Sequence, residues 1–225
     1  LSASGSRLAI GGASNNVTLN NHGQARVYEL DPERVWQQLG SDLTGEFLTD
    51  LFGKAVALSG DGTRVAVGGF LNDGEDVSQT DAGHVRVFEY NEEQKEWQQL
   101  GSDLNGPAFG SWFGFSLSLS HSGSILAVAA PGYIGYLPGL TIVYKLTNGD
   151  WVQHGEPIFG GYAVDLSHHG NRIVVGDFRG VQNGPSTGFA SVYDFNGTDW
   201  VSVGYIPGQE AGELSGSAVA ISADG

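Results

Sequence analysis

The sequence predicts an all-β fold of the β-propeller class, in which four similar units of four antiparallel strands follow one another. The first observation is a recurring Ser-x-x-Gly turn, whose serines are Ser2, Ser59, Ser120, Ser167 and Ser222. The second is a stretch of alternating apolar and polar residues with an aromatic residue at a fixed place, at Tyr28, Phe88, Tyr144 and Tyr193. The third is a Trp-x-x-x-Gly phrase near the end of each unit. Repetition of this kind is typical of an array of supersecondary units.

The first strand of each unit precedes the Ser-x-x-Gly turn. We expect these strands at residues 52–59, 113–120, 160–167 and 215–222. Small residues dominate them, and small side chains suit strands that converge near a central axis. The glycine of the turn supplies a positive φ without a steric penalty, so each turn can lead into a hairpin.

The remaining strands follow in a constant order. Second strands are expected at 7–11, 64–68, 125–129 and 172–176, and third strands at 25–30, 85–90, 141–146 and 190–195. Alternation of β-branched and aromatic residues with polar ones is a strand signal. Fourth strands carry Trp36, Trp97, Trp151 and Trp200, which we expect to pack between neighbouring units. Trp112 has no counterpart in the other units and is expected to be exposed on a loop. The pattern requires no helix.

The chain is expected to be one β-propeller domain, residues 1–225, or part of one. Its repeats span about 1–51, 52–112, 113–160 and 161–214, and residues 215–225 start a further repeat or close the ring. In one arrangement, residues 215–222 complete the unit whose other strands lie in residues 7–40, which closes a four-bladed ring. In the other, the chain is a section of a larger propeller with further repeats of the same parent chain beside it. The turn that is repeated at both ends favours the second arrangement.

Composition excludes several classes of function. The net charge is −15, so a polyanion such as a nucleic acid would be repelled. The chain contains no cysteine, which excludes disulfides, Cys-ligated zinc and thiol catalysis. No apolar run approaches the roughly 20 residues of a membrane-spanning helix.

Three phrases resemble FG-GAP repeats, which form the blades of the integrin α-subunit head and of many secreted or surface proteins. They are FGKAVALSGDGTRVAVGG at 52–69, GHVRVFEY at 83–90 and WQQLGSDLNG at 97–106. The resemblance implies an extracellular or cell-surface propeller used for adhesion or protein contact. Many FG-GAP repeats hold Ca²⁺ in the turn after the first strand, where several carboxylates must converge. No Ser-x-x-Gly turn of this chain has more than one Asp, so we expect these turns to be metal-free.

The connections between second and third strands, and those between units, are long and variable, and they are expected to share one face. Binding commonly lies on such loops of a rigid scaffold. The face is rich in acidic residues, with Arg179 as its main opposing charge. It is therefore either a solvated rim or a surface for a basic partner or divalent cations. Candidate contact residues are Asp42, Glu46, Asp103, Trp112, Tyr133 and Tyr136.

A candidate calcium site lies in the loop at 69–83. Four carboxylates, those of Asp73, Glu75, Asp76 and Asp81, are close together in this loop. Ca²⁺ prefers such hard oxygen ligands, although the spacing matches no established calcium loop. The adjacent His168 and His169 have no third ligand in their turn and are expected to be solvent-exposed.

The leading functional hypothesis is a non-enzymatic interaction or structural module that binds a protein partner through the acidic loop face. A carbohydrate-binding propeller is the second hypothesis, with the same aromatic residues stacking on sugars. A glycoside-active enzyme is the third, and it would need a buried carboxylate pair. Two sequons, at Asn16 and Asn196, fit a secreted glycoprotein.

Overall fold

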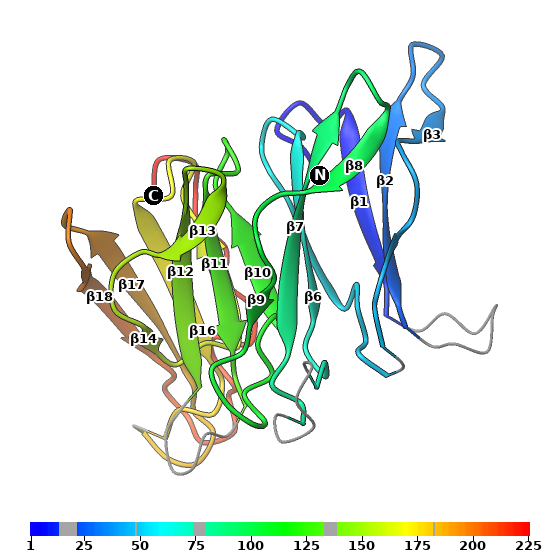
Figure 1. Cartoon of the computed structure of the whole chain (residues 1–225). Helices are drawn as coiled ribbons and strands as arrows, with labels where there is room; N and C mark the ends of the chain where they lie inside the picture. The colour runs from blue at the N-terminus through cyan, green and yellow to red at the C-terminus, as the bar shows by residue number, and fades with distance from the viewer. Residues whose placement is uncertain (14–21, 48, 74–79, 133–138, 182) are drawn as a thin grey trace.

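The computed structural model describes residues 1–13, 22–47, 49–73, 80–132, 139–181 and 183–225. In these parts of the chain the regular structure is entirely β, and the strands form four antiparallel sheets in chain order (Figure 1). The predicted all-β class is therefore confirmed. The described residues contain no helix long and apolar enough to cross a membrane.

Each sheet uses consecutive strands. Sheet I contains β1 (Arg7–Gly12), β2 (Gln24–Leu30), β3 (Trp36–Gln38) and β4 (Leu43–Thr44). Sheet II contains β5 (Ala55–Leu58), β6 (Arg64–Gly69), β7 (His84–Asn91), β8 (Glu96–Gln99) and β9 (Leu104–Asn105). Sheet III contains β10 (Ser116–Leu119), β11 (Ile125–Ala130), β12 (Leu140–Thr147), β13 (Asp150–Gln153) and β14 (Ile158–Phe159). Sheet IV contains β15 (Ala163–Leu166), β16 (Arg172–Asp177), β17 (Phe189–Phe195) and β18 (Trp200–Pro207).

The outermost strand is interrupted in the first three sheets. It splits into β3 and β4, β8 and β9, or β13 and β14, and both pieces pair with the third strand. The break falls at Gly40, Gly101 and Gly155, all of which have a positive φ. In sheet IV the strand β18 is continuous, and the register shifts between Val192 and Tyr193.

The Ser-x-x-Gly turn has a side-chain hydrogen bond that explains its recurrence. The Oγ of Ser59 is buried and accepts the main-chain N–H of Arg64 at 3.0 Å. Ser2, Ser120 and Ser167 accept the same bond from the residue five positions later. A serine at this place therefore satisfies a donor at the start of the second strand.

Neighbouring turns also contact one another. The main-chain N–H of His121 donates to the carbonyl of His168 in the next unit, at 2.9 Å. The two imidazole rings stack with their centroids 4.0 Å apart. The expectation that His168 is solvent-exposed is therefore wrong, because this ring is half-buried against the preceding turn, whereas His169 is exposed.

The core consists of three apolar clusters, each lying between two consecutive sheets. A tryptophan of each later sheet closes the contact with the sheet before it. The indole Nε1 of Trp97 donates to the carbonyl of Leu39, that of Trp151 to Leu100 and that of Trp200 to His154, at 2.8–2.9 Å. The prediction that these tryptophans pack between units is confirmed for three of the four; Trp36 is the exception.

The four sheets do not close into a ring. Residues 215–222 form no strand, contrary to prediction, and they do not pair with β1. They lie against sheet IV, where the N–H of Ile221 donates to Asp165 at 3.0 Å. Sheet I lies at the opposite end of the row (Figure 1). The physical reason is distance, because the segment is held to sheet IV, at the far end of the row from β1.

Candidate functional site

The two ends of the sheets differ in character. The Ser-x-x-Gly turns lie at one end, here called the turn end, near the labelled N and C termini (Figure 1). The connections from second to third strands lie at the other end, here called the loop end, as predicted.

Five aromatic rings form a continuous row at the loop end of the two inner strands of sheets II to IV. We call Phe70, Trp112, Phe115, Tyr162 and Phe178 the aromatic row. The Phe70 ring lies 6.2 Å from that of Trp112 and 5.3 Å from that of Phe115, centroid to centroid, in edge-to-face geometry. Phe115 is 4.8 Å from Tyr162, and Tyr162 is 4.2 Å from Phe178. All five side chains are half-buried, so the row is packed yet reachable from solvent.

The repeat itself places these rings together. Phe70 and Phe178 each follow a second strand, β6 and β16. Phe115 and Tyr162 each precede a first strand, β10 and β15. Because first and second strands are neighbours in each sheet, these four positions meet at one end of the inner strands. Sequence inspection missed them, although aligning the units would have brought them into register.

Trp112 differs from its prediction in two respects. It is half-buried against Phe70 rather than exposed on a loop. It also has structural counterparts in Leu51 and Leu214, which precede the corresponding first-strand segments. All three have a left-handed backbone, with φ of 54–58°. A non-glycine residue in this conformation is uncommon and is held by its surroundings.

A cation lies at one end of the row. The guanidinium carbon of Arg179 lies 5.2 Å from the Tyr162 ring centroid, which is cation–π distance. Its Nη1 donates to the carbonyl of Pro131 at 2.6 Å, and its other nitrogens bind the buried carboxylate of Asp177. Arg179 is therefore fixed over the ring.

Arginines already bind two of the predicted acidic contacts. Arg26 makes a bidentate pair with Asp42 at 2.7 and 2.9 Å, and hydrogen bonding to this guanidinium holds the Asp42 pKa below its ordinary value. Arg86 donates to Glu46 at 3.2 Å. The expectation that Arg179 is the main opposing charge is therefore wrong, because Arg26 and Arg86 reach this surface from the third strands.

Two further acidic side chains are hydrogen-bonded to other residues of the chain. Asp103 accepts a hydrogen bond of 2.6 Å from Gln99 on the outer strand β8. Asp50 is buried rather than part of a solvated rim, and burial raises its pKa. Its carboxylate accepts hydrogen bonds from Asn72 and from the N–H of Phe47.

Half of the candidate calcium cluster is described. Asp73 accepts the N–H of Asp81 at 2.9 Å, and burial together with the charge of Asp73 raises the Asp81 pKa. Glu75 and Asp76 lie outside the described residues, as do Tyr133, Tyr136 and the sequon residue Asn16. The described residues show no group of three or more metal-ligating side chains. The other sequon residue, Asn196, is exposed in the hairpin between β17 and β18.

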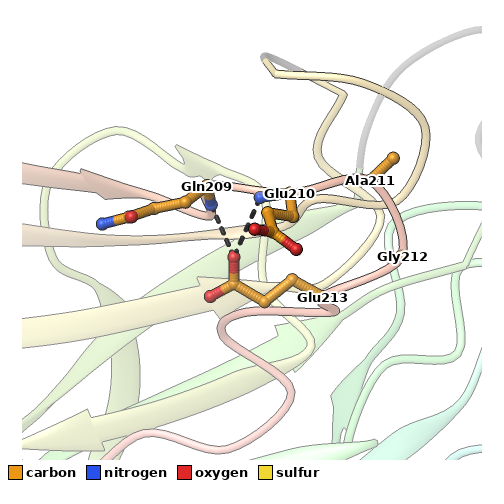
Figure 2. Close-up of a pocket in the computed structure, with 5 residues that line it drawn as sticks. All are labelled: Gln209, Glu210, Ala211, Gly212 and Glu213. Carbon is orange, nitrogen blue, oxygen red and sulfur yellow. Dashed lines mark hydrogen bonds between the residues drawn. The ribbon is translucent and has the colours of Figure 1, made fainter.

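The connection after β18 lines an open surface pocket of about 440 Å³, shown in Figure 2. Its lining residues are Gln209, Glu210, Ala211, Gly212 and Glu213. The Glu213 carboxylate points back to the N–H groups of Gln209 and Glu210 and also accepts the Ser215 hydroxyl at 2.6 Å. These bonds lower the Glu213 pKa, with the Ser215 bond first among the causes. The Glu213 carboxylate thus holds the two ends of this short connection together by hydrogen bonds.

One pentapeptide, residues 184–188, has the spacing Gly-x-Ser-x-Gly of a nucleophile elbow. Its serine, Ser186, has a positive φ of 53°. The segment lies in the connection between β16 and β17, not between a strand and a helix. No histidine among the described residues is hydrogen-bonded to its hydroxyl, so the geometry of a serine hydrolase is not assembled here.

No protein-family model matches the chain, and no curated protein matches its sequence. Solved structures do match its fold. Hydrazine synthase from Kuenenia stuttgartiensis aligns with a TM-score of 0.55 and 16% identity, over 92% of this chain and 47% of that one. A proposed 6-phosphogluconolactonase from Bacteroides uniformis aligns with 0.55 and 14%, over 84% and 53%. TolB from Acinetobacter baumannii aligns with 0.50 and 13%, over 92% and 42%.

These likenesses correct the prediction about enzymatic activity and support the prediction of a propeller-like, all-β fold. The expectation that the chain is not an enzyme is overturned, because two of the matched structures carry enzyme names and the fold gives no ground to exclude catalysis. At this identity the matches show the fold alone. The chain spans about half the length of the matched structures. It shares a propeller-like, all-β arrangement of sheets with proteins of varied function.

Proposed function

We propose that this protein is a binding module that engages a protein partner through the aromatic row at its loop end. The observation that carries the proposal is the row itself, five half-buried rings contributed by three consecutive sheets. By comparison, Phe52 and Phe113, at the Phe-Gly starts of two first strands, are fully buried, at 0% exposure. A half-buried ring retains apolar surface that a partner can cover.

The composition of the site matches that of protein interfaces. Trp, Tyr and Arg are the residues most enriched among those that dominate binding energy. Trp112 and Tyr162 belong to the aromatic row, and Arg179 lies over Tyr162. Their orientations are fixed before binding, since Arg179 is anchored to Asp177 and Pro131 and each ring contacts another. Such preorganisation reduces the entropy lost on association.

The ring geometry favours a protein over a sugar. The Phe70–Trp112 and Phe115–Tyr162 planes meet at 79° and 72°, so the edge of one ring covers the face of the next. Arg179 covers part of the remaining Tyr162 surface. Stacking on a sugar would need an open ring face, whereas an apolar peptide segment can pack against ring edges.

The proposal retains the extracellular or cell-surface location that the FG-GAP resemblance implies. The support for it is the Phe-Gly strand start at residues 52–53 and 113–114 and the exposed sequon at Asn196. Removal of a mass excess by a glycosidase from protein secreted by a eukaryotic cell would test the glycoprotein part.

A peptide-display library panned against the full chain tests the proposed function, with a glycan array as the parallel probe. We expect selected peptides to lose at least tenfold in affinity on Trp112→Ala, which corresponds to about 1.4 kcal/mol. The matched control is Phe109→Ala, because Phe109 is a more exposed aromatic residue of the same connection that lies outside the row.

Three results would count against this function. The first is that no peptide binds. The second is that bound peptides tolerate Trp112→Ala as well as they tolerate Phe109→Ala. The third is specific sugar binding that Trp112→Ala abolishes, which would favour the carbohydrate-binding hypothesis instead. Thermal melting of each variant separates a lost contact from a lost fold.

A further inference from the structure

Sheet I exposes apolar residues that its counterparts bury. Ile10 of β1 is 50% exposed and Trp36 of β3 is 39% exposed. At the same steps of the repeat, Val67, Val128 and Val175 are 0% exposed, and Trp97, Trp151 and Trp200 are 7–8% exposed. The residue types are equivalent, so the difference arises from position. Among the described residues, no sheet packs against this face of sheet I.

Sheet IV exposes the complementary residues. Ile206 of β18 pairs with Ala190 and is 64% exposed. Its counterparts Leu43, Leu104 and Ile158 occupy the same register and are 6%, 8% and 4% exposed. Val192 of β17 is half-buried, whereas Val27, Val87 and Val143 are at most 2% exposed.

These two faces are the two halves of one contact that the chain makes three times internally. Between sheets I and II, Val27 and Leu43 pack in one cluster with Val65, Val67 and Trp97. Sheets II and III, and sheets III and IV, repeat this cluster with equivalent residues. At the ends of the row, Ile10 and Trp36 form one half of the same contact, and Val192 and Ile206 form the other.

The geometry points to head-to-tail association between two copies of this chain, in which Ile10 and Trp36 of one copy pack on Val192 and Ile206 of the next. Trp97 packs with Val27 and Leu43 of sheet I in one cluster. In the proposed contact, Trp36 would meet the equivalent aliphatic side chains of the second copy. Large apolar side chains that are exposed where their counterparts are buried mark a surface that another molecule can cover. The contact joins two different faces, so it is heterologous and produces chains or a closed ring of copies.

Each internal contact between two sheets contains one Ser-x-x-Gly turn, but a contact between two copies would bring two such turns to the same place. Residues 222–225 are held on sheet IV by the Arg172 Nη1 bond to the carbonyl of Gly225, at 2.9 Å. Residues 2–5 precede β1, and the N–H of Ala3 donates to Gly60 at 2.7 Å. One of these turns moves aside on docking, which opposes association. We therefore expect association that depends on concentration and that is stronger at high salt, which screens the net charge of −15.

Sedimentation velocity of the full chain and two variants tests this contact. Trp36→Ala removes the indole from the face on sheet I, and Ile206→Asp places a charge on the face on sheet IV. Each variant alone is expected to lose the association of the unmodified chain. Mixed together, they are expected to recover a one-to-one dimer, because the intact β18 face of the first docks on the intact β3 face of the second. The control is Val152→Asp, an equally drastic change at an exposed position of β13 away from both faces, which leaves association unchanged.

Two outcomes would overturn the inference. One is an unmodified chain that stays monomeric at every concentration, which would mean that something other than a second copy covers these faces. The other is an Ile206→Asp variant that still associates as the unmodified chain does, which would indicate a symmetric contact between two β3 faces. All substituted positions are exposed in the single chain, so thermal melting is expected to show intact folding in each variant.

Discussion

The indole Nε1 of Trp97 donates a 2.8 Å hydrogen bond to the main-chain carbonyl of Leu39, in the sheet that precedes its own. The bond is repeated at Trp151 and Trp200, each reaching the residue three positions after the previous tryptophan. The outer strands of consecutive sheets are thus joined by a tryptophan of the later sheet and a carbonyl of the earlier one. This relationship has consequences that can be measured.

Trp97→Ala is expected to lower the free energy of unfolding by about 3–5 kcal/mol, because it empties a buried site and leaves the Leu39 carbonyl without its donor. Trp36→Ala is the matched change on an exposed tryptophan, and we expect it to cost less than about 1 kcal/mol in the monomer. Urea unfolding at low protein concentration measures both. Equal losses in the two variants would contradict the assigned role of the inter-sheet contact.

The glycine four residues after each tryptophan gives a second test. A Cβ added at Gly101 would lie 2.9 Å from Cδ1 of Trp151, on a backbone with φ of +78°. At Gly204 the nearest atom would be 3.7 Å away, on Val192. We expect Gly101→Ala to destabilise the chain by about 1–3 kcal/mol and Gly204→Ala to change stability by less than about 0.5 kcal/mol. Thermal melting of the pair checks the difference, and a tolerated Gly101→Ala would argue against close packing of this tryptophan.

The serine of the repeated turn is expected to be structural. Ser120→Ala removes the acceptor of the Ile125 N–H in a buried environment, and the expected loss is about 1–3 kcal/mol. Ser222→Ala is the control, because the Ser222 hydroxyl donates to the exposed Asp224 at the turn end. Chemical denaturation distinguishes them. The role fails if both variants unfold at the same midpoint.

The burial of His84 predicts that the folded chain loses stability in acid. Burial lowers its pKa from 6.5 to about 4, and the nearby Arg86 charge acts in the same direction. The folded chain therefore favours neutral His84. Its contribution to stability is fully present above pH 6.5 and is lost as the pH falls toward 4, by about 3 kcal/mol in total.

His84→Leu isolates this effect, since Leu140 occupies the equivalent position in sheet III. The stability difference between the variant and the unmodified chain, measured from pH 8 to pH 4, should move in favour of the variant as the pH falls. Titration of Asp50, whose pKa is raised, is common to both proteins and cancels in the difference. Parallel pH profiles would refute the assignment to His84.

Part of the loop-end surface could not be predicted from sequence because its charges are paired between elements. Arg26 is on β2 whereas Asp42 lies just before β4, and Arg86 reaches Glu46 from the neighbouring sheet. Counting acids along the chain could not show these pairs, since each depends on how strands are placed side by side. The aromatic row was missed for the same reason, because Phe70 and Tyr162 meet only through Phe115, in the sheet between them.

The sequence by itself determined the local structure. Alternating strands, serine turns with a positive-φ glycine and a tryptophan near the end of each unit follow from short-range patterns, and the structure contains each of them. The tertiary structure alone decided which equivalent residues are buried. Trp97 and Trp36 stand in the same phrase, yet one is 8% exposed and the other 39%, because only Trp97 has another sheet to pack against. Burial depends on neighbours, and a repeat specifies its own fold without specifying what lies beside it.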